Sequence, residues 1–379
     1  MITRIATVLL TLVMSSFTVP VLAEPLVFPY RAEVIVLDRS LEVRKEAIIE
    51  GFKEVLVRTA GRKVVLEHPE IQWVVLNEAQ RFLLQFGYNS SDEVLFVDGE
   101  LKPAKVLHLD FDGKSIRELL RSTQQSLWAP DRPKTLVWLV TDTPQAAEET
   151  PVLEFAGEPV LVSRTDSPKL DQALQKASTR RGTPLASPLL DLEDQVIAGA
   201  DMLWRMEEET LRAAAQRYSA DSSILIRYSQ TSQGGWRGSW MIIHSDTAEF
   251  ADGRAETLEQ LIGQAIDTLA DFYAEKYAVR AELGSNAGAV MTVDAVKSFA
   301  DYRGVLDGIQ RLTMVRSVHL VLTEDTQVTL MVIADGSVQK LQENLALIKR
   351  LQNQASASGM HRYMEPGSYE NPLRYLWVK

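Results

Sequence analysis

The segment from Leu107 to Asp112 alternates apolar residues with residues that could bind a metal ion. His108, Asp110 and Asp112 stand two positions apart, so on a β-strand their side chains leave the same face. An imidazole and two carboxylates suit a divalent metal ion. The same alternation is typical of a solvated strand face, with Asp112 turning into the next helix. The pattern leaves two interpretations open: a metal-binding or hydrolytic site, or the exposed side of a strand.

Trp128, Arg132 and Trp138 form the densest aromatic and basic cluster of the sequence. They could form a partner-binding surface, because Trp and Arg dominate binding hot spots. Alternatively, Arg132 could stack on an indole and fix a tight turn. We favour the structural role, because Pro130 and Pro133 already constrain the start of a buried strand.

Trp236 and Trp240 lie four residues apart and so share one face of an expected strand. If that face is exposed, the two indoles could grip a peptide or a glycan. If the amphipathic helix from Leu258 to Tyr273 covers it, they belong to the core. We favour the core, because the apolar stripe of that helix needs a surface to bury.

Recognisable catalytic motifs are absent from the sequence. It has no H-E-x-x-H pair, no G-x-S-x-G elbow, no P-loop and no dinucleotide fingerprint. It also has no cysteine, which removes disulfides and thiol chemistry. A Ser-His-Asp triad assembled from distant residues stays open. We expect no cofactor, and we favour a non-enzymatic protein over an enzyme.

The first 23 residues are typical of a secretory signal peptide. Arg4 precedes an apolar stretch from Ile5 to Met14, and Val21-Leu22-Ala23 suits cleavage after Ala23. No later stretch approaches a transmembrane length, so we expect no stable membrane insertion after cleavage. The net charge of −11 argues against nucleic acid as a partner. The oligomeric state stays open.

The length and periodicity predict an α+β protein of three small mixed units, in which helices lie on short sheets. In the first unit we expect a helix from Pro69 to Phe86 and a buried strand from Leu136 to Val140. The order β-α-β-β-α of the last unit, closed by Arg374 to Val378, is typical of a split ferredoxin-like unit. The expected divisions are a signal peptide over 1–23 and units over 24–150, 151–283 and 284–379.

Several segments together carry a resemblance to a known family. They are Ala32 to Val36, Arg44 with Ala47, Val55 to Gly61, Phe111-Asp112 and Leu127 to Leu139. In these segments the chain resembles an uncharacterised exported family of Gram-negative bacteria, domain-of-unknown-function family 2066. The resemblance implies residence in the periplasm and supplies no activity.

A second resemblance concerns the middle unit. A helix, a short turn and the strands around Ile224 to Ile226 and Trp236 to Ile243 are similar to the amino-terminal modules of TolB-like envelope assembly proteins. Those modules bind other proteins. We therefore expect a soluble periplasmic protein that binds another envelope protein, with the hydrolase or metal-binding enzyme of His108, Asp110 and Asp112 as the alternative.

Overall fold

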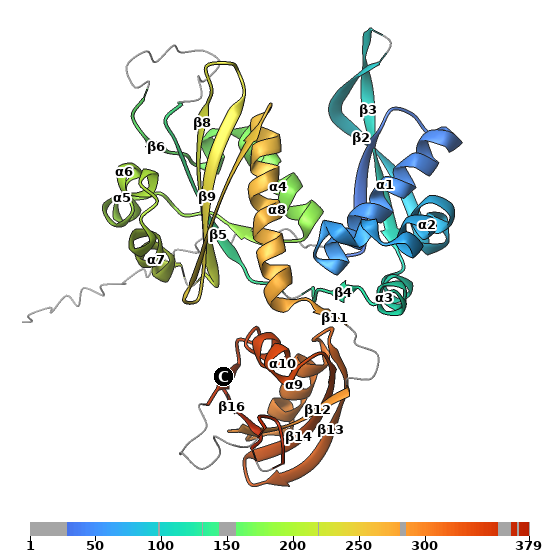
Figure 1. Ribbon diagram of the computed structural model, residues 1–379, viewed down its shortest axis with the longest axis vertical. Coiled ribbons are helices and arrows are strands. Elements are labelled where there is room, and N and C mark those ends of the chain that lie inside the picture. Colours follow the sequence, from blue (N-terminus) through green and yellow to red (C-terminus); the bar gives the residue numbers. More distant parts are fainter. Residues whose placement is uncertain are drawn as a thin grey trace, which may run out of the picture.

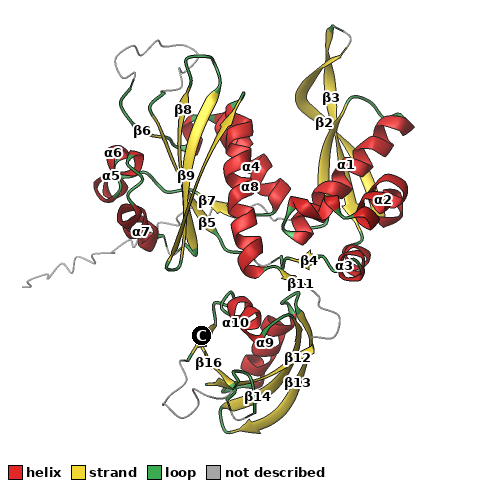
Figure 2. Cartoon of the chain, viewed as in Figure 1, coloured by secondary structure: helices red, strands yellow, loops and turns green. Residues whose placement is uncertain are grey.

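The computed structural model describes residues 29–97, 99–130, 132–143, 157–218, 220–280, 286–354, 365–369 and 371–378. The expected signal segment and its cleavage site lie outside these residues. Helices lie against small separate sheets, so the expected α+β class is confirmed (Figures 1 and 2). No helix in the described residues is long and apolar enough to cross a membrane.

The N-terminal unit packs helices on one face of an antiparallel sheet of order β1-β3-β2. Its elements are β1 (Arg31–Val36), α1 (Leu41–Ala60), α2 (Pro69–Glu78), β2 (Leu83–Val97), β3 (Glu100–Phe111), α3 (Gly113–Ser122) and β4 (Ser126–Leu127), with 3-10 turns at Lys63–Glu67 and Ala79–Phe82. Ser40 caps the start of α1, because its side chain accepts a hydrogen bond from the Val43 amide. Gly61, which has the left-handed φ of +89°, caps the end of the helix.

The central unit has a mixed sheet of order β10-β9-β8-β5-β6, with β7 beside β5. Its elements are β5 (Thr135–Thr141), β6 (Val160–Leu161), α4 (Pro168–Arg181), β7 (Leu185–Ala186), α5 (Leu192–Ile197), α6 (Ala200–Trp204), α7 (Glu208–Arg217), β8 (Ser222–Gln230), β9 (Trp236–His244), β10 (Thr247–Ala255) and α8 (Leu258–Tyr277), with a 3-10 turn at Arg164–Asp166. Helices α4 and α8 cover one face of this sheet, and α5, α6 and α7 lie on the other (Figure 2).

Strand β5 belongs to this central sheet and not, as expected from the sequence, to the N-terminal unit. It pairs in parallel with β8, and every residue of β5 is buried. A strand buried on both faces needs helices on both sides, and the central unit supplies them. The hydrophobic core accordingly changes between Leu127 and Trp128, well before residue 150.

The C-terminal unit has a sheet of order β13-β14-β12-β16-β15. Its elements are β12 (Asn286–Asp294), α9 (Phe299–Gln310), β13 (Val315–Glu324), β14 (Gln327–Asp335), α10 (Val338–Leu345), β15 (Leu351–Asn353) and β16 (Leu373–Trp377). The short strand β11 (Val279–Arg280) precedes them and pairs with β4 of the N-terminal unit.

The topology of this last unit departs from the expected ferredoxin-like one. Strands β12 and β13 flank β14 as in a split β-α-β unit. Strand β16, however, runs parallel to β12 and separates it from β15. After α10 the described chain forms β15 and β16, where a ferredoxin-like unit has a single last strand. The full ferredoxin-like order is therefore not confirmed.

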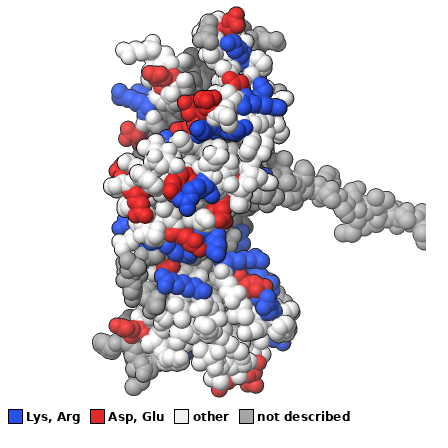
Figure 3. Space-filling view, turned by 90° about the vertical axis from the view of Figure 1, so that its right-hand side faces the viewer, with Lys and Arg blue, Asp and Glu red and all other residues white. Residues whose placement is uncertain are grey.

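The three units meet around the carboxyl end of α8 (Figure 1). On the face shown in Figure 3, charges of both signs are interspersed over the upper part, and the C-terminal unit is mostly uncharged. The β2–β3 hairpin projects away from the other two units (Figure 1).

Candidate functional site

Trp128 and Arg132 lie together where the chain passes from the N-terminal to the central unit. The guanidinium carbon of Arg132 lies 3.7 Å from the centre of the Trp128 ring. Nη2 of Arg132 donates to the carbonyl oxygen of Arg58, and Nη1 donates to those of Arg181 and Gly182. These carbonyls belong to the last turns of α1 and α4, where a cation is favoured by the helix dipole. The pair therefore joins the ends of these two helices.

Arg58 and Arg181 connect the same helices in a reciprocal way. Arg58 of α1 donates through Nε to the carbonyl oxygen of Arg180, at 3.2 Å. Arg181 of α4 donates to the carbonyl oxygen of Gly61, at 2.7 Å, and pairs with Asp271 of α8. We call Arg58, Arg132 and Arg181 the arginine junction. The guanidinium groups of the junction donate to backbone carbonyl oxygens of the same protein. The junction therefore has a structural role.

Burial changes the pKa values of charged groups in and beside the junction. Burial, together with the neighbouring Arg58 and Arg181 charges, lowers the pKa of Arg132. Burial likewise raises the pKa of Glu54, even though Glu54 pairs with Arg58. The Trp128 ring and the helix carbonyls replace the water that Arg132 has lost.

The other candidate tryptophans are distributed over both faces of the central sheet. Trp138 is fully buried under α5, α6 and α7, 6.4 Å from the Tyr218 ring. Trp240 is buried on the opposite face under α8, and Trp236 packs at the edge of the same core beside Tyr228. The structure therefore brings Trp128 and Arg132 together and keeps Trp138 apart from them.

His108 and Asp110 lie on the outer face of β3, and each has a partner. Nδ1 of His108 lies 3.0 Å from a carboxylate oxygen of Glu33. Asp110 pairs with Arg31 at 2.6 Å, and this hydrogen bond holds the pKa of Asp110 below its usual value. Asp112 follows the strand and caps α3 through the amides of its first turn.

These contacts favour the solvated-face interpretation of the three residues. Among the described residues, no group of three or more His, Cys, Asp or Glu side chains could hold a metal ion. The Arg31 cation beside Asp110 also disfavours a second cation at this place.

The distal part of the β2–β3 hairpin carries exposed apolar side chains. We call Val94–Val97 and Glu100–Pro103 the β2–β3 arm. Phe96 and Leu101 are directly opposite each other in the ladder and are 73% and 68% exposed. Val94, two residues before Phe96, lies on the same face and is also exposed. Large apolar side chains grouped on an exposed face indicate a contact site.

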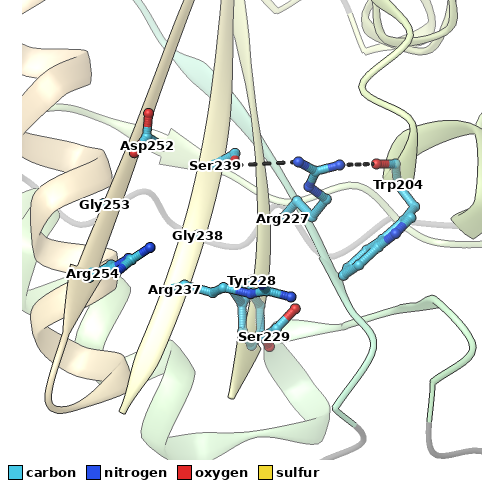
Figure 4. Close-up of a pocket in the computed structure, with 10 residues that line it drawn as sticks. All are labelled: Trp204, Arg227, Tyr228, Ser229, Arg237, Gly238, Ser239, Asp252, Gly253 and Arg254. Carbon is cyan, nitrogen blue, oxygen red and sulfur yellow. Dashed lines mark hydrogen bonds between the residues drawn. The ribbon is translucent and has the colours of Figure 1, made fainter. Parts of the chain in front are cut away.

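A groove with three arginines lies on the central sheet, beyond the carboxyl end of α6 (Figure 4). The cavity has a volume of about 460 Å³. The side chains of its walls come from α6, β8, β9 and β10: Trp204, Arg227, Ser229, Arg237, Ser239, Asp252 and Arg254. We call Arg227, Arg237 and Arg254 the arginine groove.

Neither the arm nor the groove was among the sites expected from the sequence. The arm has a signal in the sequence, since Asp98-Gly99 between apolar runs is typical of a β-hairpin turn. The groove has none, because its arginines come from separate strands and meet only through the register of β8, β9 and β10.

One family model without an assigned function is similar to part of the chain. Residues 27–129 match a family model described as a domain of unknown function (DUF8605). This match agrees with an uncharacterised domain, and it does not confirm the resemblance to family 2066 or to TolB-like modules. No curated protein matches the chain.

One solved structure with a local similarity is the homoserine dehydrogenase of S. aureus, in a crystal structure at pH 6.5. The identity is 16%, the match covers 28% of each chain, and the TM-score is 0.13. A similarity at this score supports no inference about fold or activity.

Proposed function

We propose that this protein is exported to the periplasm, is cleaved after Ala23, and acts there without catalysis by binding another protein of the cell envelope. The signal-like first 23 residues support export. The resemblance to family 2066 supports a periplasmic location, and the resemblance to TolB-like modules supports envelope assembly as the process. The observation that carries the binding function is the exposed β2–β3 arm.

Strand β2 offers two features that a partner can use. Among the described residues it pairs with β3 alone, so its other edge has no strand partner in that part of the chain. Residues 83–97 also contain no Lys and no Pro, the residues that commonly protect edge strands from pairing. An extended segment can therefore add to this edge through main-chain hydrogen bonds.

The expected occupant is an extended, apolar segment of a different protein. Phe96 and Leu101 provide a flat apolar face beside the free edge. Alternate apolar side chains of an added strand would pack against this face, because side chains alternate between the two faces of a sheet. The pairing is irregular between Ser90 and Val94 and regular in the arm, so the arm is the better platform for an added strand.

The experiment is site-specific photo-crosslinking in cells that make the full chain. A photoreactive residue replaces Phe96 on the arm or, as a control of similar exposure, Leu76 on α2. We expect a discrete adduct with a second protein from position 96, none from position 76, and a weaker adduct when Leu101→Asp is added. The same adducts from both positions, or adducts of the chain with itself alone, would contradict the proposal.

The alternative, a hydrolase or metal-binding enzyme using His108, Asp110 and Asp112, gains no support from the contacts of these residues. His108 faces Glu33, Asp110 is held by Arg31, and Asp112 is occupied as a helix cap.

A further inference from the structure

The face of the central sheet that α5, α6 and α7 cover is apolar at one end of its strands and polar at the other. Leu225 and Met241 are directly opposite each other and are fully buried under α5, α6 and α7. The next pair on this face is Arg227, two residues after Leu225, and Ser239, two residues before Met241. Helix α6 ends at Trp204, next to this pair. The sheet surface beyond Trp204 is therefore polar and forms the groove.

Arg237 and Arg254 are a like-charged pair in direct cross-strand register on β9 and β10. Like charges directly opposite each other in an antiparallel pair destabilise the sheet. Within the described part of the chain, neither guanidinium has a carboxylate within ion-pair distance. Asp252 lines the same groove, opposite Ser239, and forms no ion pair with either arginine there. The free protein thus keeps an unfavourable charge arrangement.

Arg227 adds a third positive charge with a fixed orientation. Its Nη1 donates to the carbonyl oxygen of Trp204 at 2.8 Å, and its guanidinium carbon lies 5.4 Å from the centre of the Trp204 ring. Nη2 reaches the hydroxyl of Ser239 at 3.4 Å (Figure 4). These contacts hold the guanidinium at the groove without neutralising its charge.

The arginines of the groove differ from those of the junction in their partners. In the junction, the Nη1 and Nη2 donors of Arg132 end on carbonyl oxygens at helix ends, and Arg58 and Arg181 also pair with carboxylates. In the groove, Arg237 and Arg254 are exposed and aligned on an open surface. The groove also concentrates positive charge on a chain whose net charge is −11. A structural role explains the junction and leaves the groove unexplained.

We propose that the arginine groove binds a small molecule that carries an oxyanion group with at least two equivalent oxygens, a phosphate or a carboxylate. The guanidinium groups of Arg237 and Arg254 suit such a group, because each can donate two parallel hydrogen bonds to it. Ser229 adds a hydroxyl in the same row as these arginines. The Trp204 ring offers a flat wall for the rest of the ligand. The volume of the groove is in the range of small-molecule sites.

This inference does not depend on the β2–β3 arm. The groove lies on β8, β9 and β10 of the central sheet, and the arm belongs to the N-terminal sheet. Loss of arm binding and loss of ligand binding are therefore separate results, and each can be measured on the full chain.

The test is isothermal titration calorimetry of the purified full chain at low ionic strength, with pyrophosphate and citrate as probes. The groove variant is Arg237→Gln with Arg254→Gln. The control is Arg303→Gln with Arg311→Gln, which changes the net charge equally and removes exposed arginines at α9. We expect binding by the unchanged protein and by the control. The groove variant should bind roughly tenfold more weakly or worse, because charge-assisted hydrogen bonds are lost.

Thermal unfolding without ligand separates this effect from misfolding. The midpoint of the groove variant should equal or exceed that of the unchanged protein, because the repulsion between Arg237 and Arg254 is gone. Binding of pyrophosphate alone would assign a phosphate ligand, and binding of citrate alone a carboxylate ligand. Failure of both probes at millimolar concentration, or equal affinity in the groove variant, would overturn the proposal.

Discussion

Arg132 stacks on the ring of Trp128 at 3.7 Å and donates from the same guanidinium to the carbonyl oxygen of Arg58. This relationship decides the role of the densest aromatic and basic cluster in the sequence. Trp128 is buried, and Arg132 ties α1 to α4. Trp128 and Arg132 therefore fix how the N-terminal unit sits on the central unit, and the proposed binding surfaces lie elsewhere.

Replacement of Arg132 should destabilise the contact between these units. Arg132→Leu leaves several carbonyl oxygens at the helix ends without a donor, which should lower the free energy of unfolding by about 2–4 kcal/mol. Arg132→Lys should give an intermediate loss, because an ammonium group cannot reproduce the fork of donors. Urea unfolding followed by tryptophan fluorescence measures both. A change in Arg132→Leu no larger than that in Arg303→Leu would contradict the assignment.

Gly61 should tolerate alanine less well than Gly99, although both have a left-handed φ. A Cβ on Gly61 would lie 2.5 Å from Cβ of Ala274, and a Cβ on Gly99 would meet nothing. Gly99→Ala should therefore cost about 1 kcal/mol for the backbone alone. Gly61→Ala should cost about 1–3 kcal/mol more, because it also overpacks the contact between α1 and α8. Equal thermal midpoints for the two variants would show that the close approach is absent.

The buried His244 should make stability depend on pH. Its Nδ1 lies 2.9 Å from the carbonyl oxygen of Asp221, and its Nε2 contacts the Tyr277 hydroxyl. Burial, aided by the nearby Lys276 charge, lowers the pKa of His244 below its usual value of 6.5. The unfolded chain therefore binds the proton more readily, so this contribution to stability is lost as the pH falls through about 6.5 and below.

His244→Gln should accordingly flatten the loss of stability between about pH 7.5 and about pH 5.5, where one such group changes the free energy by at most about 1.4 kcal/mol per pH unit. Urea unfolding at several pH values checks this. The exposed His319→Gln is the matched control and should keep the slope of the unchanged protein. The same slope in both variants would rule out His244 as the titrating group.

The arm residues should matter little for stability. Phe96→Ser with Leu101→Ser should change the free energy of unfolding by less than about 0.5 kcal/mol, because both side chains are exposed. Phe52→Ala, on the buried face of α1, should cost about 3–5 kcal/mol. A loss of more than about 1 kcal/mol in the arm variant would place these residues in the core and remove them as a contact surface.

Periodicity alone predicted much of the architecture, and its failures have local causes. The stripe from Leu258 to Tyr273 does form a helix over the face that holds Trp240. The helix expected from Pro69 to Phe86 ends at Glu78, and β2 begins at Leu83. Apolar residues on both faces of the hairpin obscure its alternation, so Asp98-Gly99 is the clearest sign of the hairpin in the sequence.

Long-range register explains what the sequence could not supply. The topology of the C-terminal unit depends on β16 entering beside β12, a choice that the order of elements leaves open. Within the groove, Arg237 aligns with Arg254 and with Ser229 only through the register of three strands. By contrast, the partners of His108 and Asp110 follow from pairing of β1 with β3, which local alternation made plausible.

Hydrogen exchange along β2 tests the central claim, partner binding at the β2–β3 arm, most directly. The full chain is compared with its complex with the protein captured by crosslinking at position 96. We predict slower amide exchange in Leu83–Val97 on binding, with the opposite edge strand Arg31–Val36 unchanged, because an added strand gives the free β2 edge hydrogen-bond partners. Unchanged exchange in β2, with protection elsewhere in the chain, would contradict the account.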